Sequence, residues 1–153
     1  MERKLIIIGK RSNLSKRLNK YIKNSLLIPT KDIDQLELTV KNFKKIDFIY
    51  NSSFKSSLLN KNDASPIDYS NYSFHYLSKF VNICNRYFNH INSVIYSSSC
   101  ALYGDNEYAK ENDEIKITNL YAGLKISSEY FLEKYLSDKN INLIFARIFN
   151  MYG

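Results

Sequence analysis

Short apolar runs recur along this chain of 153 residues, and they constrain the fold more than any other feature. The runs span Leu5–Ile8, Leu26–Ile28, Asp47–Tyr50, Val94–Tyr96 and Leu143–Ile148. They lack the alternation of a half-exposed strand, and unbroken short runs are typical of strands that are buried on both faces. Between the runs, apolar residues recur at spacings of three and four, as in amphipathic helices. This alternation predicts an α/β fold with a doubly wound parallel sheet.

The length and the pattern together indicate one domain covering residues 1–153, because a chain of this size buries one core and not two. Helical spacing is clearest around residues 14–22, 73–88 and 121–137. Two polar stretches, residues 52–71 and 104–120, contain few apolar positions and are predicted to be long loops. Long loops in a compact domain are usually functional or mobile.

Composition excludes several classes of protein. Residues 1–61 carry 14 Lys and Arg against 5 Asp and Glu, whereas residues 62–153 carry 8 against 10. The basic residues form no compact block, which favours a solvated face over a nucleic-acid site. No run is long enough to span a membrane, and no signal segment opens the chain, so we expect a cytoplasmic protein. Cys84 and Cys100 lie in unrelated contexts, which predicts two small buried residues, with neither a disulfide nor a metal site.

The first strand ends in a segment that fits an anion. Gly9 to Ser15 read G-K-R-S-N-L-S, in the place where dinucleotide-binding folds carry a G-x-x-G-x-x-G loop before a helix. Only Gly9 matches a glycine of that pattern, and Ser12 and Ser15 stand at the other two positions. Serine hydroxyls and the flanking basic residues could bind phosphate at the helix N-terminus. An ordinary strand-to-helix turn with solvated charges explains this segment equally well.

The predicted strand at Val94–Tyr96 is followed by Ser97-Ser98-Ser99. About twenty residues later, a predicted helix begins with Tyr121 and Lys125. Residues four apart share a helix face, so we expect the Lys125 ammonium to lower the pKa of the Tyr121 phenol. Such a tyrosine can exchange a proton with a sugar hydroxyl while a nicotinamide ring exchanges hydride. Tyr-x-x-x-Lys alone occurs often by chance, but the serine strand before it makes the pattern specific.

Three segments together resemble the extended short-chain dehydrogenase/reductases, the NAD-dependent sugar-nucleotide epimerases and dehydratases. They read V-I-Y-S-S-S-C-A-L-Y-G-D, N-L-Y-A-G-L-K-I-S-S-E and A-R-I-F-N-M-Y-G. The resemblance spans the whole chain and implies a Rossmann-like domain that binds NAD or NADP. It also implies that the catalytic residues are Ser99, Tyr121 and Lys125.

The same resemblance implies positions around the ligands. The residues implied for cofactor binding are Gly9, Ser12, Asn13, Leu14, Asp32, Asn51, Ser52, Ser53, Tyr121 and Lys125, with Asn150 for substrate. Asp32 lies at the distance expected of a ribose-binding acid. The serines in the glycine loop predict weakened cofactor binding, which restoring glycine at Ser12 and Ser15 should tighten.

Departures from the family limit the functional prediction. Cys100-Ala101 replace the Asp-Glu pair of the dehydratases, which disfavours dehydration and leaves epimerisation or reduction of a nucleotide sugar. The chain stops at Gly153, where family members continue into a substrate domain, so we expect an inactive or partial fragment. The alternative is a degenerate Rossmann module that binds a nucleotide or another protein without catalysis.

Large aromatic residues on two predicted helices suggest association. Family dimers pair two such helices from each copy, and Tyr76, Phe80, Tyr130 and Tyr135 are large for a solvated surface. The sequence therefore predicts a homodimer, although packing of these aromatics on the chain's own sheet explains them almost equally well.

Overall fold

The computed structural model describes residues 3–51 and 65–149, and its centre is one five-stranded sheet. The strands are β1 (Arg3–Ile8), β2 (Leu26–Ile28), β3 (Lys45–Tyr50), β4 (Ile91–Ser99) and β5 (Asn142–Ile148). They lie in the order β2-β1-β3-β4-β5, and every neighbouring pair is parallel. All five predicted strands and their parallel arrangement are confirmed.

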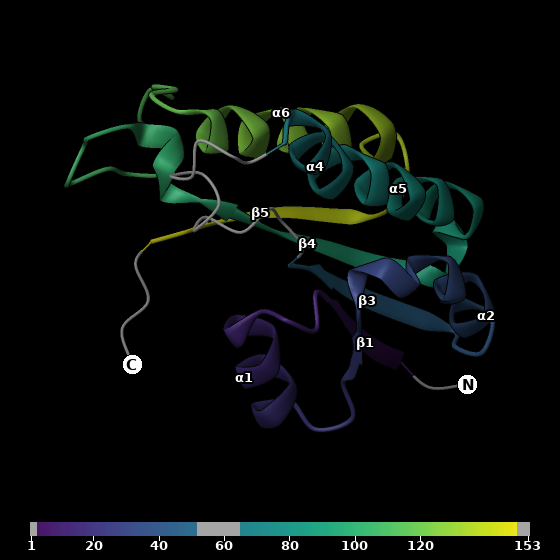
Figure 1. The fold of residues 1–153 in the computed structure, drawn as a ribbon. Helices are drawn as coiled ribbons and strands as arrows, with labels where there is room; N and C mark the ends of the chain where they lie inside the picture. Colours follow the sequence, from purple (N-terminus) through teal and green to yellow (C-terminus); the bar gives the residue numbers. More distant parts are fainter. Residues whose placement is uncertain (1–2, 52–64, 150–153) are drawn as a thin grey trace.

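Helices lie on both faces of this sheet (Figure 1). They are α1 (Asn13–Tyr21), α2 (Leu36–Val40), α4 (Pro66–Ser70), α5 (Tyr76–Arg86) and α6 (Leu120–Leu136). Shorter helical turns are η1 (Thr30–Gln35), η2 (Asn71–His75), η3 (Phe88–His90) and η4 (Cys100–Tyr103). Figure 1 shows α5 and α6 side by side on one face and α1 on the other, which is the doubly wound, Rossmann-like arrangement. No helix among the described residues is both long and apolar enough to cross a membrane.

The main core lies between the sheet and α5 with α6. Phe80 of α5 is fully buried, and its ring centroid lies 5.1 Å from that of Phe48 and 4.9 Å from that of Tyr50. Leu132 and Leu136 of α6 are also fully buried in this cluster. The core therefore fixes α6 against the sheet, and α6 carries the predicted tyrosine and lysine.

One predicted loop is partly helical. Within residues 52–71, the described end forms α4, so the loop prediction was wrong there. The Ser65 hydroxyl accepts a hydrogen bond from the Ile67 N–H at 3.2 Å, and Pro66 occupies the first turn. Serine before proline is a strong helix start, which outweighs the low apolar content of the segment.

The predicted interface aromatics divide into two groups. Phe80 is buried in the chain's own core, and Tyr76 packs against the same core. Tyr130 and Tyr135 of α6 are 64% and 48% exposed. Packing on the chain's own sheet therefore explains the first pair, and only the second pair lies on the surface.

The two cysteines also differ. Cys84 is fully buried in α5, as expected. The prediction was wrong for Cys100, which is only partly buried because it begins the short turn η4 at the edge of the sheet.

The carboxyl ends of the strands meet at one edge. The Gly9 N–H, just after β1, donates to the Ile28 carbonyl at the end of β2 at 2.9 Å. The Asn51 N–H, just after β3, donates to the Ile8 carbonyl at the end of β1, also at 2.9 Å. Ligands of doubly wound sheets bind at this edge.

Candidate active site

The turn from β1 into α1 carries the predicted phosphate loop. Gly9 has a φ of 115°, which favours glycine. Ser12 is the N-cap of α1, but its hydroxyl makes no capping hydrogen bond. The first N–H groups of the helix, including those of Asn13 and Leu14, have no partner within the helix. Such a turn is suited to a phosphate, because these N–H groups and the helix dipole attract anions.

The Asn51 side chain ties this loop to the end of β3. Its Nδ2 donates to the hydroxyl oxygens of Ser12 and Ser15, at 2.8 Å each. Ser15 is fully buried. The serines that replace two glycines therefore join the loop to the neighbouring strand in addition to adding bulk. The sequence singled out all three residues but not the bonds between them.

Asp32 lies in η1, shortly after the carboxyl end of β2, and is partly buried. Its backbone N–H donates to the Pro29 carbonyl at 3.0 Å. Because β2 pairs with β1, Asp32 stands at the same edge of the sheet as the phosphate loop. The predicted ligand-binding residues Ser52, Ser53 and Asn150 lie outside the described residues.

The structure brings Ser99 and Tyr121 together. Ser99 ends β4, and its Oγ accepts from the Ala101 N–H at 3.2 Å. Asn119 caps α6, with its Oδ1 accepting from the Ala122 N–H at 2.9 Å, so Tyr121 lies in a fixed first turn. Burial raises the pKa of the Tyr121 phenol, and a hydrogen bond with the Ser99 side chain opposes that rise.

Lys125 is buried one turn further along α6, with 4% of its surface exposed. Its Nζ donates to the Ser97 carbonyl at 2.6 Å. The same nitrogen lies 4.8 Å from the ring centroid of Tyr96 and 5.7 Å from that of Tyr121. Burial lowers the pKa of Lys125 to about 7, and the Glu129 carboxylate opposes this shift.

The predicted effect of Lys125 on Tyr121 was wrong, because the pKa of this phenol is raised and not lowered. Burial penalises the phenolate, and it also weakens the positive charge that would stabilise a phenolate. The Lys125 ammonium is directed to the Ser97 carbonyl and lies closer to the Tyr96 ring than to the Tyr121 ring. Spacing along the helix predicted proximity correctly but not the sign of the shift.

The edge of the sheet thus holds two chemically distinct regions. Backbone N–H groups at the start of α1 suit an anion, and the Ser99 and Tyr121 hydroxyls beside a buried lysine suit proton transfer. Within residues 3–51 and 65–149, no group of three His, Cys, Asp or Glu side chains is placed to hold a metal ion.

Comparison with known proteins agrees with this geometry. A model of the NAD dependent epimerase/dehydratase family matches residues 2–153. The chain belongs to this family.

Solved structures similar to this family member include two epimerases. The UDP-N-acetylglucosamine 4-epimerase of Methanobrevibacter ruminantium, solved with UDP-N-acetylmuramic acid, has a TM-score of 0.76 at 21% identity, over 99% of this chain and 56% of that one. The UDP-glucose 4-epimerase of Brucella ovis, solved with NAD, has a TM-score of 0.74 at 16% identity, over 97% and 52%. The chain therefore spans about half the length of these structures, which share its fold.

A curated relative matches a shorter part of this family member. The ADP-L-glycero-D-manno-heptose-6-epimerase of Alkalilimnicola ehrlichii is 37% identical over 60 residues, which cover 39% of this chain and 19% of the relative. The match concerns a limited segment, and the assignment to the family rests on the match over residues 2–153.

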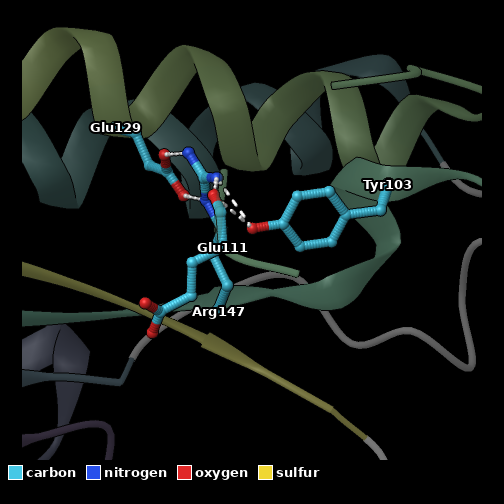
Figure 2. Close-up of polar contacts among 4 residues, drawn as sticks. All are labelled: Tyr103, Glu111, Glu129 and Arg147. Carbon is cyan, nitrogen blue, oxygen red and sulfur yellow. Dashed lines mark hydrogen bonds and ion pairs between the residues drawn. The ribbon is translucent and has the colours of Figure 1, made fainter. Parts of the chain in front are cut away.

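In this epimerase/dehydratase-family chain, sequence reasoning missed a partly buried ion pair next to the candidate site. Arg147 of β5 donates from Nε and Nη2 to the two carboxylate oxygens of Glu129 in α6, at 3.2 and 2.9 Å (Figure 2). Glu129 lies four residues after Lys125 and eight after Tyr121. Helical spacing, which relates Tyr121 to Lys125, would also have placed Glu129 on that face.

Proposed function

We propose that this chain carries the cofactor-binding and proton-transfer half of an NAD(P)-dependent enzyme that epimerises or reduces the sugar of a nucleotide sugar. The observation that supports this most strongly is the meeting of Ser99, Tyr121 and Lys125 at the carboxyl edge of the sheet. Two hydroxyls and an amine lie there, at the same edge of the sheet as a turn suited to phosphate, in a chain of the NAD-dependent epimerase/dehydratase family.

The phosphate loop fits a dinucleotide in its backbone. Gly9 adopts the left-handed φ, and the Ser12 hydroxyl is turned to Asn51 and leaves the first N–H groups of α1 uncapped. In the proposal, Gly9, Ser12, Asn13 and Leu14 hold the pyrophosphate, and Asp32 binds a ribose hydroxyl. When bound, NAD or NADP supplies the nicotinamide ring that accepts or returns a hydride.

In the proposal, Tyr121 exchanges a proton with a sugar hydroxyl, and Ser99 hydrogen-bonds the same oxygen. The raised pKa keeps the Tyr121 phenol protonated at neutral pH in the chain without ligand. A protonated phenol can donate its proton to the carbonyl oxygen of a keto sugar, as reduction of that carbonyl to a hydroxyl requires. Removal of a hydroxyl proton, with which epimerisation begins, requires the phenolate form of Tyr121, which burial disfavours here.

We propose that the nucleotide diphosphate of the substrate is bound largely by a segment that these 153 residues do not include. The similar solved structures are about twice as long as this chain. Binding energy far from the reacting carbon orients that carbon in an enzyme. The chain as given, with Asn150 as a substrate contact, is therefore proposed to be inactive alone.

The proposal also covers association and compartment. The exposed Tyr130 and Tyr135 of α6 support a homodimer through this helix. Cys84 and Cys100 are free thiols, which suits a reducing compartment such as the cytoplasm.

A second candidate function is a nucleotide-binding or interaction module without catalysis. The observation in its favour is the loop, where Ser12 and Ser15 occupy glycine positions and are tied to Asn51. Side chains there limit the close approach of a pyrophosphate to the backbone.

Calorimetry separates the two candidates. We expect the chain to bind NAD(H) or NADP(H), and absence of binding of all four would contradict the enzyme proposal. In a longer chain that includes the substrate-binding segment, Tyr121→Phe should lower turnover by about 10²–10⁴-fold with cofactor affinity retained. Tyr108→Phe, at a tyrosine that is 86% exposed, is the matched control and should keep full activity.

A further inference from the structure

The ion pair between buried Glu129 and partly buried Arg147 is part of a longer network (Figure 2). Arg147 donates from Nη1 to the Tyr103 hydroxyl at 2.9 Å, and this hydroxyl donates to the Glu111 carbonyl at 3.2 Å. Glu129 and Tyr103 are 3% and 2% exposed. The network therefore joins β5, α6, η4 and the loop that leads to Tyr121, and it compensates a carboxylate that would be costly to bury alone.

Glu129 shares a helix face with Lys125, one turn away, and both side chains are buried. The direct contacts of the Lys125 nitrogen are uncharged: the Ser97 carbonyl and the rings of Tyr96 and Tyr121. In a buried setting, a charge one helical turn away acts more strongly than it would in water.

The charged groups of α5 and η2, which pack against α6, are directed away from Lys125. On α5, Lys79 pairs with Asp34 and Arg86 with Glu37, and His75 of η2 is exposed. The titratable groups shown to act on or contact Lys125 itself are Tyr96, Tyr121 and Glu129. One contact further away, Arg147 pairs with Glu129, Tyr103 contacts Arg147, and Cys100 acts on Tyr121. The carboxylate of Glu129 and the guanidinium of Arg147 thus form the charged pair that can act on Lys125.

We propose that the Glu129–Arg147 pair sets the charge on Lys125, with Arg147 as a positioning residue that limits how much of the Glu129 charge reaches the lysine. Glu129 favours the ammonium form, and Arg147 offsets part of that effect by neutralising Glu129. Burial, opposed by the Glu129 carboxylate, leaves the pKa of Lys125 at about 7, so that a small further shift changes its charge at neutral pH. A role of the Glu129–Arg147 pair in catalysis rests on the proposed function, whereas its effect on the charge of Lys125 does not.

NMR titration of lysine side chains labelled with ¹³C and ¹⁵N tests the proposal in the 153-residue chain. The Lys125 signal is assigned by its loss in Lys125→Met. We expect Glu129→Gln to lower the apparent pKa of Lys125 by about one pH unit and Arg147→Gln to raise it by a similar amount. The double variant Glu129→Gln/Arg147→Gln should give a pKa of Lys125 between those of the two single variants, because both charges are removed. Arg147→Lys retains the charge and should leave the titration of Lys125 nearly unchanged.

Opposite signs in the two single variants distinguish a charge effect from structural damage. Shifts in the same direction, or no shift in Glu129→Gln, would overturn the proposal. If Arg147→Gln does not fold, the variants Glu129→Gln and Arg147→Lys still test the proposal, because only Glu129→Gln should shift the pKa of Lys125. Tyr103→Phe leaves both charges in place and is the matched control. Failure to bind any cofactor would contradict the proposed function and leave these titrations unaffected.

Discussion

The sheet buries charge at both of its ends, but in different ways. At the amino end, Asp47 of β3 accepts from Arg3 at 2.5 and 3.1 Å, from Asn92 at 2.8 Å and from Ser93 at 2.6 Å. Burial alone raises the pKa of Asp47, but the hydrogen bonds from Arg3, Ser93 and Asn92 outweigh it and hold the pKa below its usual value. This carboxylate is saturated with donors.

At the carboxyl end, Lys125 has one hydrogen bond, to the Ser97 carbonyl, and no ion pair with any described residue. Burial is the dominant influence there and moves its pKa far toward neutrality. Asp47, which lies far from the candidate site, thus has hydrogen-bond donors for its full charge. The buried Lys125 ammonium, at the candidate site, is under-compensated by comparison. Such charges are typical of functional sites and cost stability.

The largest expected effect is a gain in stability on Lys125→Met. The folded-state pKa of about 7 lies below the ordinary 10.5, so the burial penalty is complete below pH 7 and disappears by pH 10.5. The parent should therefore become more stable as the pH rises through this window. At pH 6 we expect the variant to be more stable by about 2–4 kcal/mol, with no such rise.

Urea unfolding at pH 6, 8 and 10 measures this difference. Lys16→Met, at an exposed position of α1, is the control and should change stability by less than about 0.5 kcal/mol. An unchanged pH dependence in Lys125→Met would contradict the account of Lys125 as an under-compensated charge.

At the other end of the sheet, Asp47→Asn should lower stability by about 1–3 kcal/mol at pH 7, because a buried hydrogen-bonded charge is lost. The lowered pKa means that the stabilisation by Asp47 is complete above the ordinary value of 3.8 and is lost as the pH falls through the folded-state value. The variant should therefore lose part of the parent's acid sensitivity. Unfolding between pH 2 and 7 tests this, with exposed Asp105→Asn as the control. Equal acid sensitivity in Asp47→Asn and the parent would count against it.

Most of the sheet could be predicted from the sequence, because a buried strand is a local pattern. The run at Leu5–Ile8 lies within β1, and the serines after Val94–Tyr96 end β4. The helix α4 was missed, because its stability comes from its Ser-Pro start and not from an apolar stripe.

The candidate site was predicted in its residues but not in its energetics. Tyr121 and Lys125 are related by helix geometry, which sequence spacing contains. The bonds of Asn51 to Ser12 and Ser15 cross 39 and 36 positions of the chain, and no local pattern reports such pairings. The sign of the pKa shift of Tyr121 depends on burial, which is a property of the folded chain.

Ser12 and Ser15, both hydrogen-bonded to Asn51, form a polar group at the carboxyl end of the sheet that, unlike Lys125, is well supplied with partners. The sequence predicts tighter cofactor binding when glycine replaces both Ser12 and Ser15, but the structure separates the two positions. Ser15 is fully buried and accepts from Asn51, so Ser15→Gly should cost about 1–2 kcal/mol through the lost bond and the glycine in a helix.

Ser12 is partly exposed at the N-cap, where glycine costs only a few tenths of a kcal/mol. Ser12→Gly alone should therefore tighten NAD(H) or NADP(H) binding with little loss of stability. Calorimetry and urea unfolding of both variants check this. Tighter cofactor binding in Ser15→Gly than in Ser12→Gly would show that the Asn51 cross-link hinders the loop and does not support it.

A smaller effect than at Lys125, Asp47 or Ser15 is expected at Asn119, which caps α6 near Lys125. Asn119→Ala removes the acceptor for the Ala122 N–H and should lower stability by about 1 kcal/mol. Because Tyr121 lies in the turn that this cap fixes, fraying there should loosen its hydrogen bond with Ser99 and expose the phenol to water. Exposure removes the burial that raises the pKa of Tyr121, so its ultraviolet titration should move toward the ordinary value of 10.0. Asn119→Ser keeps a capping oxygen and should behave as the parent. A Tyr121 titration that stays unchanged in Asn119→Ala, despite the lost stability, would mean that the core contacts of α6 hold the tyrosine without the cap.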